Sequence, residues 1–170
     1  LAVMSILSAS RLPDFDLARL TIFQVGKPMS LTRARAAAEE IESKVAFQSE
    51  GVTSSVLVVA TRESRALMLN GLGQGARSAL PPYGEFESVL VGAMPAVHHP
   101  RPRRALIVGL GAGVTLETLK VLKVDQVSVV ELEEEVVRAV DVIYGGSPSP
   151  TKGPGVFVEI NDARQHLQVH

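Results

Sequence analysis

The sequence predicts an α/β protein in which a small antiparallel β-domain precedes a parallel sheet. Two observations support this prediction. Two runs rich in β-branched and apolar residues, VTSSVLVVAT and RALMLNG, are separated by the polar turn RES, which is the pattern of a β-hairpin. From residue 105 onward, strand and helix patterns alternate in the order β-α-β-α-β, which is typical of a parallel sheet with right-handed crossovers.

The composition indicates a globular protein. Hydrophobic residues make up 46% of the 170 residues and charged residues 21%, which is enough apolar material for a buried core. The net charge of −1 gives no broad basic surface, so we expect no nucleic-acid partner. The absence of cysteine excludes a disulfide scaffold and thiolate metal ligands, and the histidines have no third ligand beside them in the sequence, so no metal is expected. A cytoplasmic location fits this composition.

The chain divides into three predicted parts. Residues 1–44 form a helical and linker segment, in which the Ala- and Glu-rich stretch 30–44 is a helix capped by Ser30 or Thr32. Its start, LAVMSILSAS, fits either a short terminal helix or strand or the end of a longer apolar segment. Residues 45–80 form a small β-hairpin domain with a turn at Asn70-Gly71, and residues 81–170 form a partial parallel-sheet domain.

Each element of the third part follows from its own pattern. A helix is expected over about 84–93, with Pro95 near its end, and PRPRR then forms a linker. Strands are expected at 105–108, 126–132 and 156–160, and helices at about 114–122 and 133–144. A last helix is expected to start within NDARQHLQVH.

Three glycines follow the first of these strands, in RALIVGLGAGVTLETLK. Gly109, Gly111 and Gly113 let the backbone approach a ligand without a clash from Cβ, and the helix behind them offers unpaired N–H groups. The dinucleotide-binding pattern would place a third small residue at Val114, so the spacing G-x-G-x-G instead resembles the first motif of S-adenosylmethionine-binding sheets. This predicts a Rossmann-like sheet of the methyltransferase type; the alternative is a tight turn that holds no ligand.

The next strand ends at Glu131, where a carboxylate is placed to accept hydrogen bonds from both ribose hydroxyls. The alternative is that Glu131 only begins the acidic stretch ELEEE, because acids favour the start of a helix. That alternative accounts well for Glu133, Glu134 and Glu135, but less well for Glu131, which follows the strand directly.

Asp162 follows the third strand and could accept a hydrogen bond from an adenine amine, with the N–H of Ala163 facing a ring nitrogen. An N-cap of the last helix, formed by Asn161 or Asp162, is the other interpretation, and the two are compatible.

With these motifs, residues 46–170 resemble the polyamine aminopropyltransferases, the spermidine synthase family. The segments that carry the resemblance are LMLNGLGQ, YGEF, HPRPRRALIVGLGAGVTLETLK, VSVVELEEEVV and NDARQHL. The family has a small β-domain before a Rossmann-like sheet. Its enzymes transfer an aminopropyl group from decarboxylated S-adenosylmethionine to an amine such as putrescine, with methylthioadenosine as the leaving group, and they are often dimers.

The resemblance implies a role for individual residues of this chain. Gln74 matches the family's glutamine near the nucleotide, and Tyr83 and Glu85 match the tyrosine and the acid of a substrate gate. The remaining matches are with the nucleoside site: Gly109, Gly111 and Gly113 in the loop, Glu131 at the ribose, and Asp162 with Ala163 at the adenine.

Other features depart from the family. Gly84 stands where the gate has a histidine, Ala112 where the loop carries an aspartate, and SALPP where an acid pair precedes the gate. The family's catalytic aspartate follows a fourth strand, so the resemblance places it beyond His170 and identifies no catalytic residue in this chain. EGVTSSVLVV and VGLGAGVTLETL look closest to a bacterial branch in which a membrane transporter-like half comes first, which implies a location on the cytoplasmic face of a membrane protein.

Three functions therefore stay open at this point: an aminopropyltransferase acting on a polyamine, an S-adenosylmethionine-dependent methyltransferase on the same sheet, and a non-catalytic binding or scaffold domain.

Overall fold

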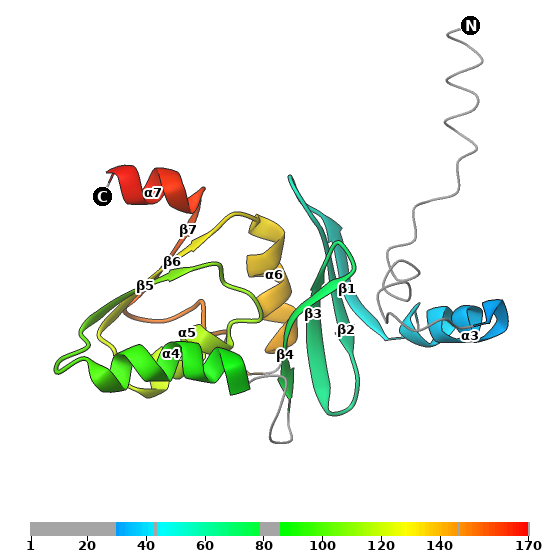
Figure 1. Ribbon diagram of the computed structural model, residues 1–170, viewed down its shortest axis with the longest axis horizontal. Coiled ribbons are helices and arrows are strands. Elements are labelled where there is room, and N and C mark those ends of the chain that lie inside the picture. The colour runs from blue at the N-terminus through cyan, green and yellow to red at the C-terminus, as the bar shows by residue number, and fades with distance from the viewer. Residues whose placement is uncertain (1–29, 43, 79–85, 146, 170) are drawn as a thin grey trace, which may run out of the picture.

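The computed structural model describes residues 30–42, 44–78, 86–145 and 147–169, which form two sheets (Figure 1). The first sheet is antiparallel and has the order β1-β2-β3-β4, with β1 at Val45–Glu50, β2 at Ser55–Ala60, β3 at Ser64–Leu69 and β4 at Leu72–Ser78. The second is parallel and has the order β5-β6-β7, with β5 at Arg104–Val108, β6 at Gln126–Glu131 and β7 at Val156–Ile160. The predicted fold class is confirmed.

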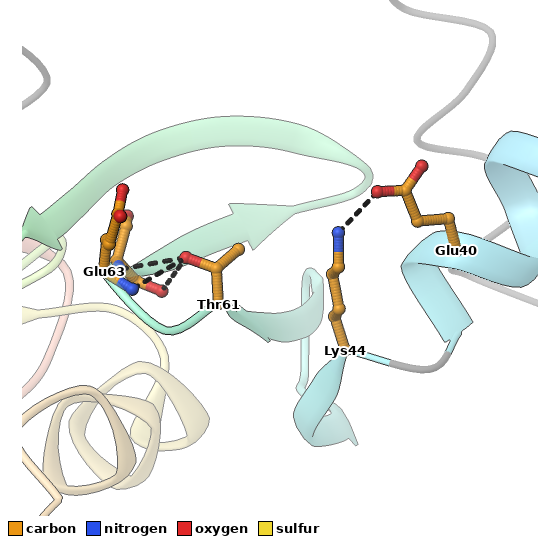
Figure 2. A network of polar contacts seen from close by, with 5 residues as sticks. Glu40, Lys44, Thr61 and Glu63 are labelled. Atoms are coloured by element: carbon orange, nitrogen blue, oxygen red, sulfur yellow. Dashed lines mark hydrogen bonds and ion pairs between the residues drawn. The ribbon is translucent and has the colours of Figure 1, made fainter.

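Side chains and backbone conformation at the turns fix the antiparallel sheet. The Thr61 hydroxyl accepts hydrogen bonds from the N–H groups of Glu63 and Ser64, at 3.3 and 3.0 Å, and closes the turn between β2 and β3 (Figure 2). Asn70 and Gly71 both have positive φ, 49° and 77°, as the tight turn between β3 and β4 requires. The antiparallel sheet predicted from 45 onward is confirmed and has four strands.

Helix α3 (Leu31–Glu42) lies beyond the antiparallel sheet on the side away from the parallel sheet (Figure 1). Ser30 Oγ accepts a hydrogen bond from the N–H of Arg33 at 3.4 Å, which confirms its predicted role as the N-cap. At the other end, Lys44 Nζ lies 2.6 Å from Glu40 Oε1 and joins the helix to the start of β1 (Figure 2).

Helix α4 (Phe86–His98) extends further than the sequence predicts, because it continues through Pro95 instead of ending near Ala93. A proline lacks the N–H that a helix interior needs, so one helical hydrogen bond is lost there. Packing on α5 (Val114–Val121) offsets that loss. A methyl group on Gly92 would lie 3.1 Å from the Thr115 carbonyl oxygen, so the two helices approach closely, and Ala96 is buried one turn later.

Helix α6 (Glu134–Ile143) contacts strands of both sheets and lies between them (Figure 1). Its buried side chains belong to one hydrophobic cluster with residues of the antiparallel sheet and of β6; these residues are Val136, Ala139, Val140, Ile143, Val56, Val58, Leu67, Val127 and Val129. The two sheets therefore share a core. The last helix, α7, runs over Ala163–Val169.

Within the described ranges, no helix has the length and apolar character that crossing a membrane requires. The apolar start of the chain, LAVMSILSAS, lies outside the described residues.

Candidate functional site

The three parallel strands end at one edge of their sheet, and this edge gathers the predicted site residues. Gly109 follows β5, Glu131 ends β6 and Asp162 follows β7. The N–H of Gly109 donates to the Val130 carbonyl at 2.8 Å, and the N–H of Asn161 donates to the Glu131 carbonyl at 2.9 Å. The loops after neighbouring strands therefore lie side by side, as a parallel sheet requires.

The glycine loop has the backbone that its sequence predicts. Gly109, Gly111 and Gly113 all have positive φ, at 83°, 54° and 83°, which side chains with a Cβ rarely adopt. A methyl group on Gly109 would meet no atom within 4 Å, and one on Gly111 would meet only the Gln74 carbonyl oxygen at 3.8 Å. The loop backbone is therefore accessible at its first two glycines.

The third glycine faces the protein interior. A methyl group on Gly113 would lie 3.1 Å from both Pro150 and Val140 and 3.3 Å from the Tyr144 ring, and its N–H already donates to the Leu110 carbonyl at 3.1 Å. The structure thus gives Gly113 a role in packing α5 against α6. Contact between this glycine and a nucleoside remains a prediction.

Glu131 is held in place by backbone N–H groups. Its side chain is buried, with only 8% of the residue exposed. Oε2 accepts from the N–H of Leu110 at 2.7 Å, while Oε1 accepts from Leu132 and Glu133 at 2.8 and 3.0 Å. These three bonds leave one of the four lone-pair positions of the carboxylate, on Oε2, so one ribose hydroxyl could bind there beside the Leu110 amide, and a second would have to compete with the amides of Leu132 and Glu133 on Oε1.

Asp162 has the capping role that one interpretation gives it. Its Oδ1 accepts from the N–H of Arg164 at 2.7 Å at the start of α7, and Ala163 is the first residue of that helix. The adenine contacts of Asp162 and Ala163 remain predictions.

Strand β4 of the antiparallel sheet borders the glycine loop. In addition to the contact between Gln74 and Gly111, a methyl group on Gly75 would lie 3.4 Å from Ala112 Cβ. Gln74 is exposed, and its carbonyl oxygen faces Gly111, so this predicted site residue lies beside the loop. Its contact with a nucleoside remains a prediction. The predicted gate residues, Tyr83 and Glu85, lie outside the described residues.

Sequence reasoning missed the role of Glu133. Its carboxylate accepts hydrogen bonds from the N–H of Val52 at 2.9 Å and from both the N–H and the hydroxyl of Thr53. Glu133 does begin the helix, as the sequence indicates, because it is the N-cap residue of α6, but it is 3% exposed and its side chain makes no capping hydrogen bond there. Burial favours the neutral form, but the bonds from Thr53 and Val52 outweigh it and lower the pKa of Glu133. No local sequence signal indicates a contact 80 residues away.

A second group of polar residues lies next to Gly113, on the side of the loop that faces the protein interior. The Tyr144 hydroxyl donates to Glu117 Oε2 at 2.7 Å, and the Arg77 guanidinium lies 4.5 Å from the centre of the Tyr144 ring and 3.5 Å from Glu117 Oε1. Burial, and then the bond to Glu117, raise the pKa of Tyr144 well above its ordinary value. This cluster joins β4, α5 and the C-cap residue of α6 next to Gly113.

Metal ligands do not gather in the described part of the chain, where no group of three His, Asp or Glu side chains is placed to hold an ion.

The shared edge, the glycine loop and the buried acid at the end of β6 define a Rossmann-like α/β protein with an antiparallel sheet docked beside it. No protein-family model matches the chain. Polyamine aminopropyltransferase 1 of Hyperthermus butylicus is 32% identical over 127 residues, which are 74% of this chain and 40% of that protein. The chain is therefore similar in sequence to the polyamine aminopropyltransferases, the spermidine synthase family.

Solved structures show the same fold. The spermidine synthase of Thermotoga maritima superposes with a TM-score of 0.65 at 15% identity, over 74% of this chain and 44% of that one. A spermidine synthase in complex with the transition-state analogue AdoDATO gives a TM-score of 0.65 at 15% identity, over 74% and 43% of the two chains. A probable spermidine synthase from Corynebacterium glutamicum gives 0.54 at 21% identity, over 71% and 46%. The chain spans less than half the length of these relatives.

Proposed function

We propose that the protein is an aminopropyltransferase of the spermidine synthase type, and that this chain supplies its nucleoside-binding part. The donor would be decarboxylated S-adenosylmethionine and the acceptor a polyamine. The observation that carries the proposal is the buried Glu131 carboxylate, held beside a glycine loop that is open at Gly109 and Gly111. The relationship to a polyamine aminopropyltransferase supports the choice of donor.

The proposed reaction is a displacement at carbon. The acceptor nitrogen attacks the carbon bonded to the sulfonium, the C–S bond breaks, its electron pair stays on sulfur, and methylthioadenosine leaves. The nitrogen loses one proton to a base, which we assign to none of the described residues. The contribution of this chain is then positioning, because a displacement needs its two reactants held in line.

The predicted site residues would hold the donor or form the entrance for the amine. Glu131 would bind the ribose, and Asp162 with Ala163 the adenine. Gln74, on the bordering strand, would line the nucleoside. Tyr83 and Glu85 are proposed as the gate through which the amine enters.

Homodimer formation, a cytoplasmic location and attachment to a membrane-embedded half stay predictions from the family resemblance.

A second candidate function, S-adenosylmethionine-dependent methyl transfer, is favoured by the environment of Ala112. This residue is 6% exposed and packs toward Gly75: a methyl group added to Gly75 would lie 3.4 Å from Ala112 Cβ. The glycine loop therefore offers no carboxylate at this position to an ammonium group on the donor. A comparison of the two donors decides between the candidates.

The test is calorimetric titration of the protein at its natural length with methylthioadenosine, S-adenosylmethionine and the decarboxylated donor. Glu131→Gln removes one carboxylate oxygen and its charge, and should weaken methylthioadenosine binding by about 10- to 100-fold, as expected for a charge-assisted hydrogen bond. Glu134→Gln is the matched control, because Glu134 is exposed at the start of α6. Urea unfolding of both variants separates loss of binding from loss of fold.

Each outcome has a distinct meaning. Equal affinity in the wild type and Glu131→Gln would contradict the ribose role. Preference for S-adenosylmethionine, with transfer of its methyl group, would favour the second candidate. Failure of the wild type to bind any of the three would favour a non-catalytic domain.

A further inference from the structure

We propose that Glu133 is a positioning residue, which docks the β1–β2 turn of the antiparallel sheet onto the parallel sheet and thereby holds Glu131 in its binding orientation. This inference rests on the proposed nucleoside site. It assigns to the small β-domain a function in that site beyond the wall formed by β4.

The first support is the set of contacts around the Glu133 carboxylate. The turn between β1 and β2 presents the N–H groups of Val52 and Thr53 and the Thr53 hydroxyl to it. Within the described part of the chain, no Lys or Arg pairs with this acid, so three hydrogen bonds from one turn compensate for its burial. Burial of a carboxylate is costly unless such bonds are made, so the turn and the acid need each other.

The second support is the fit of the turn. Gly51 precedes the two donors, and its N–H closes the turn by donating to the Ser54 carbonyl at 2.8 Å. A methyl group on Gly51 would lie 2.2 Å from Glu133 Oε2, a distance that Cβ atoms in proteins essentially never show. The same methyl group would lie 2.9 Å from the Ser54 carbonyl oxygen, so alanine at position 51 would require both the Glu133 side chain and the turn to shift.

The third support is the continuity of the bonds from the turn to the glycine loop. The N–H of Glu133 donates to Glu131 Oε1, and the other oxygen of Glu131 accepts from Leu110 within the loop. The side chain of Glu133 is held by the antiparallel sheet while its backbone holds Glu131. A turn that undocks would free the 131–133 segment, and with it the carboxylate proposed to bind ribose.

A role in the helix alone does not account for these contacts. Glu133 is the N-cap residue of α6 but its side chain makes no capping hydrogen bond, and the exposed Glu134 already places an acid in the first turn. The Glu133 carboxylate is directed to another sheet instead.

The experiment disrupts the docking from both sides. Glu133→Gln replaces one acceptor oxygen by a donor, and Gly51→Ala inserts the clashing methyl group from the other domain. The matched controls are Glu134→Gln and Gly73→Ala, because a methyl group on Gly73 meets no atom within 4 Å. The Gly51→Ala/Glu133→Asp pair tests partial rescue, since the shorter acid withdraws from the added methyl group while the contact with the Ser54 carbonyl oxygen remains.

Two quantities are measured on the protein at its natural length: the methylthioadenosine affinity by calorimetry, and the amide NMR signals of Val52, Thr53 and Leu110. Glu133→Gln and Gly51→Ala should shift all three amide signals and weaken binding by about five- to tenfold, the lower range of coupling between distant groups. The two controls should stay within about twofold, and the Asp rescue should recover part of the loss in Gly51→Ala.

Three results would overturn the inference. The amide signals of Val52 and Thr53 could stay unchanged in Glu133→Gln, which would show that the turn is not docked by this acid. The turn signals could shift while Leu110 and the affinity stay constant, which would reduce Glu133 to a purely structural contact. Absence of binding by the wild type would remove the proposed function as well, and only this outcome does so.

Discussion

Gly109→Ala and Gly113→Ala form a matched pair that separates backbone strain from packing in the glycine loop. Both glycines have a φ of 83°, so alanine is strained at both positions. Their surroundings differ, because a methyl group on Gly109 meets nothing within 4 Å, whereas one on Gly113 meets Pro150, Val140 and Tyr144 at 3.1–3.3 Å.

The two costs can be estimated separately. Left-handed backbone at a residue with a Cβ costs about 1–2 kcal/mol, which is the whole expected effect of Gly109→Ala on the free energy of unfolding. Overpacking of a buried site adds about 1–3 kcal/mol, and this applies only to Gly113→Ala because Val140 and Tyr144 are fully buried and cannot move aside. We expect Gly113→Ala to be destabilised by about 2–5 kcal/mol.

Urea unfolding followed by circular dichroism measures both changes. Methylthioadenosine titration of the folded variants adds a second comparison, in which Gly109→Ala should weaken binding more than its stability loss explains, because its methyl group occupies the open side of the loop. Equal destabilisation by the two substitutions would refute the assignment of Gly113 to packing.

Three further predictions concern the buried polar groups. Tyr144→Phe removes the donor to Glu117 and should lower the free energy of unfolding by about 1–2 kcal/mol, so unchanged urea stability would contradict the role of that bond. In a Tyr83→Phe background Tyr144 is the remaining tyrosine. Burial and Glu117 raise the pKa of Tyr144 above the ordinary 10.0, so its contribution to stability is lost as pH rises above that value. An absorbance titration should therefore show phenolate only when the protein unfolds. Phenolate in the folded protein near pH 10 would argue against this. The pKa of Glu133 lies below 4.5, so its contribution to stability is lost as pH falls below that value. Urea unfolding across pH 3–7 should therefore show a free energy of unfolding that falls less steeply toward low pH in Glu133→Gln than in the wild type. An identical fall in both proteins would count against this.

The parallel sheet and its ligand edge could be predicted because they depend on local patterns. A strand, a glycine turn and a helix follow one another within 104–121, and Glu131 ends the next strand, so the sequence alone places both at one edge. Gln74 came instead from the family resemblance, and the structure places it beside Gly111.

The elements missed or misjudged depend on partners far along the chain. β4 reads LGQGARS, and its two glycines conceal the alternation of a strand, although β3 pairs with it along its length. Pro95 disfavours a helix in isolation, and the close packing of α4 on α5 at Gly92 stabilises the longer helix. In both cases tertiary contacts override the local preference.

The segment Glu131-Leu132-Glu133 shows why the burial of its acids could not be inferred from alternation. Residues two apart on an extended chain face the same side, and Glu133 has extended backbone angles, φ −112° and ψ 117°. The two acids are buried while Leu132 between them is 51% exposed, which inverts the usual strand pattern. Two like charges buried two residues apart are unfavourable unless each has its own donors. The glycine loop supplies a donor to Glu131 and the β1–β2 turn supplies donors to Glu133, so this edge of the sheet is complete only when the antiparallel sheet is docked.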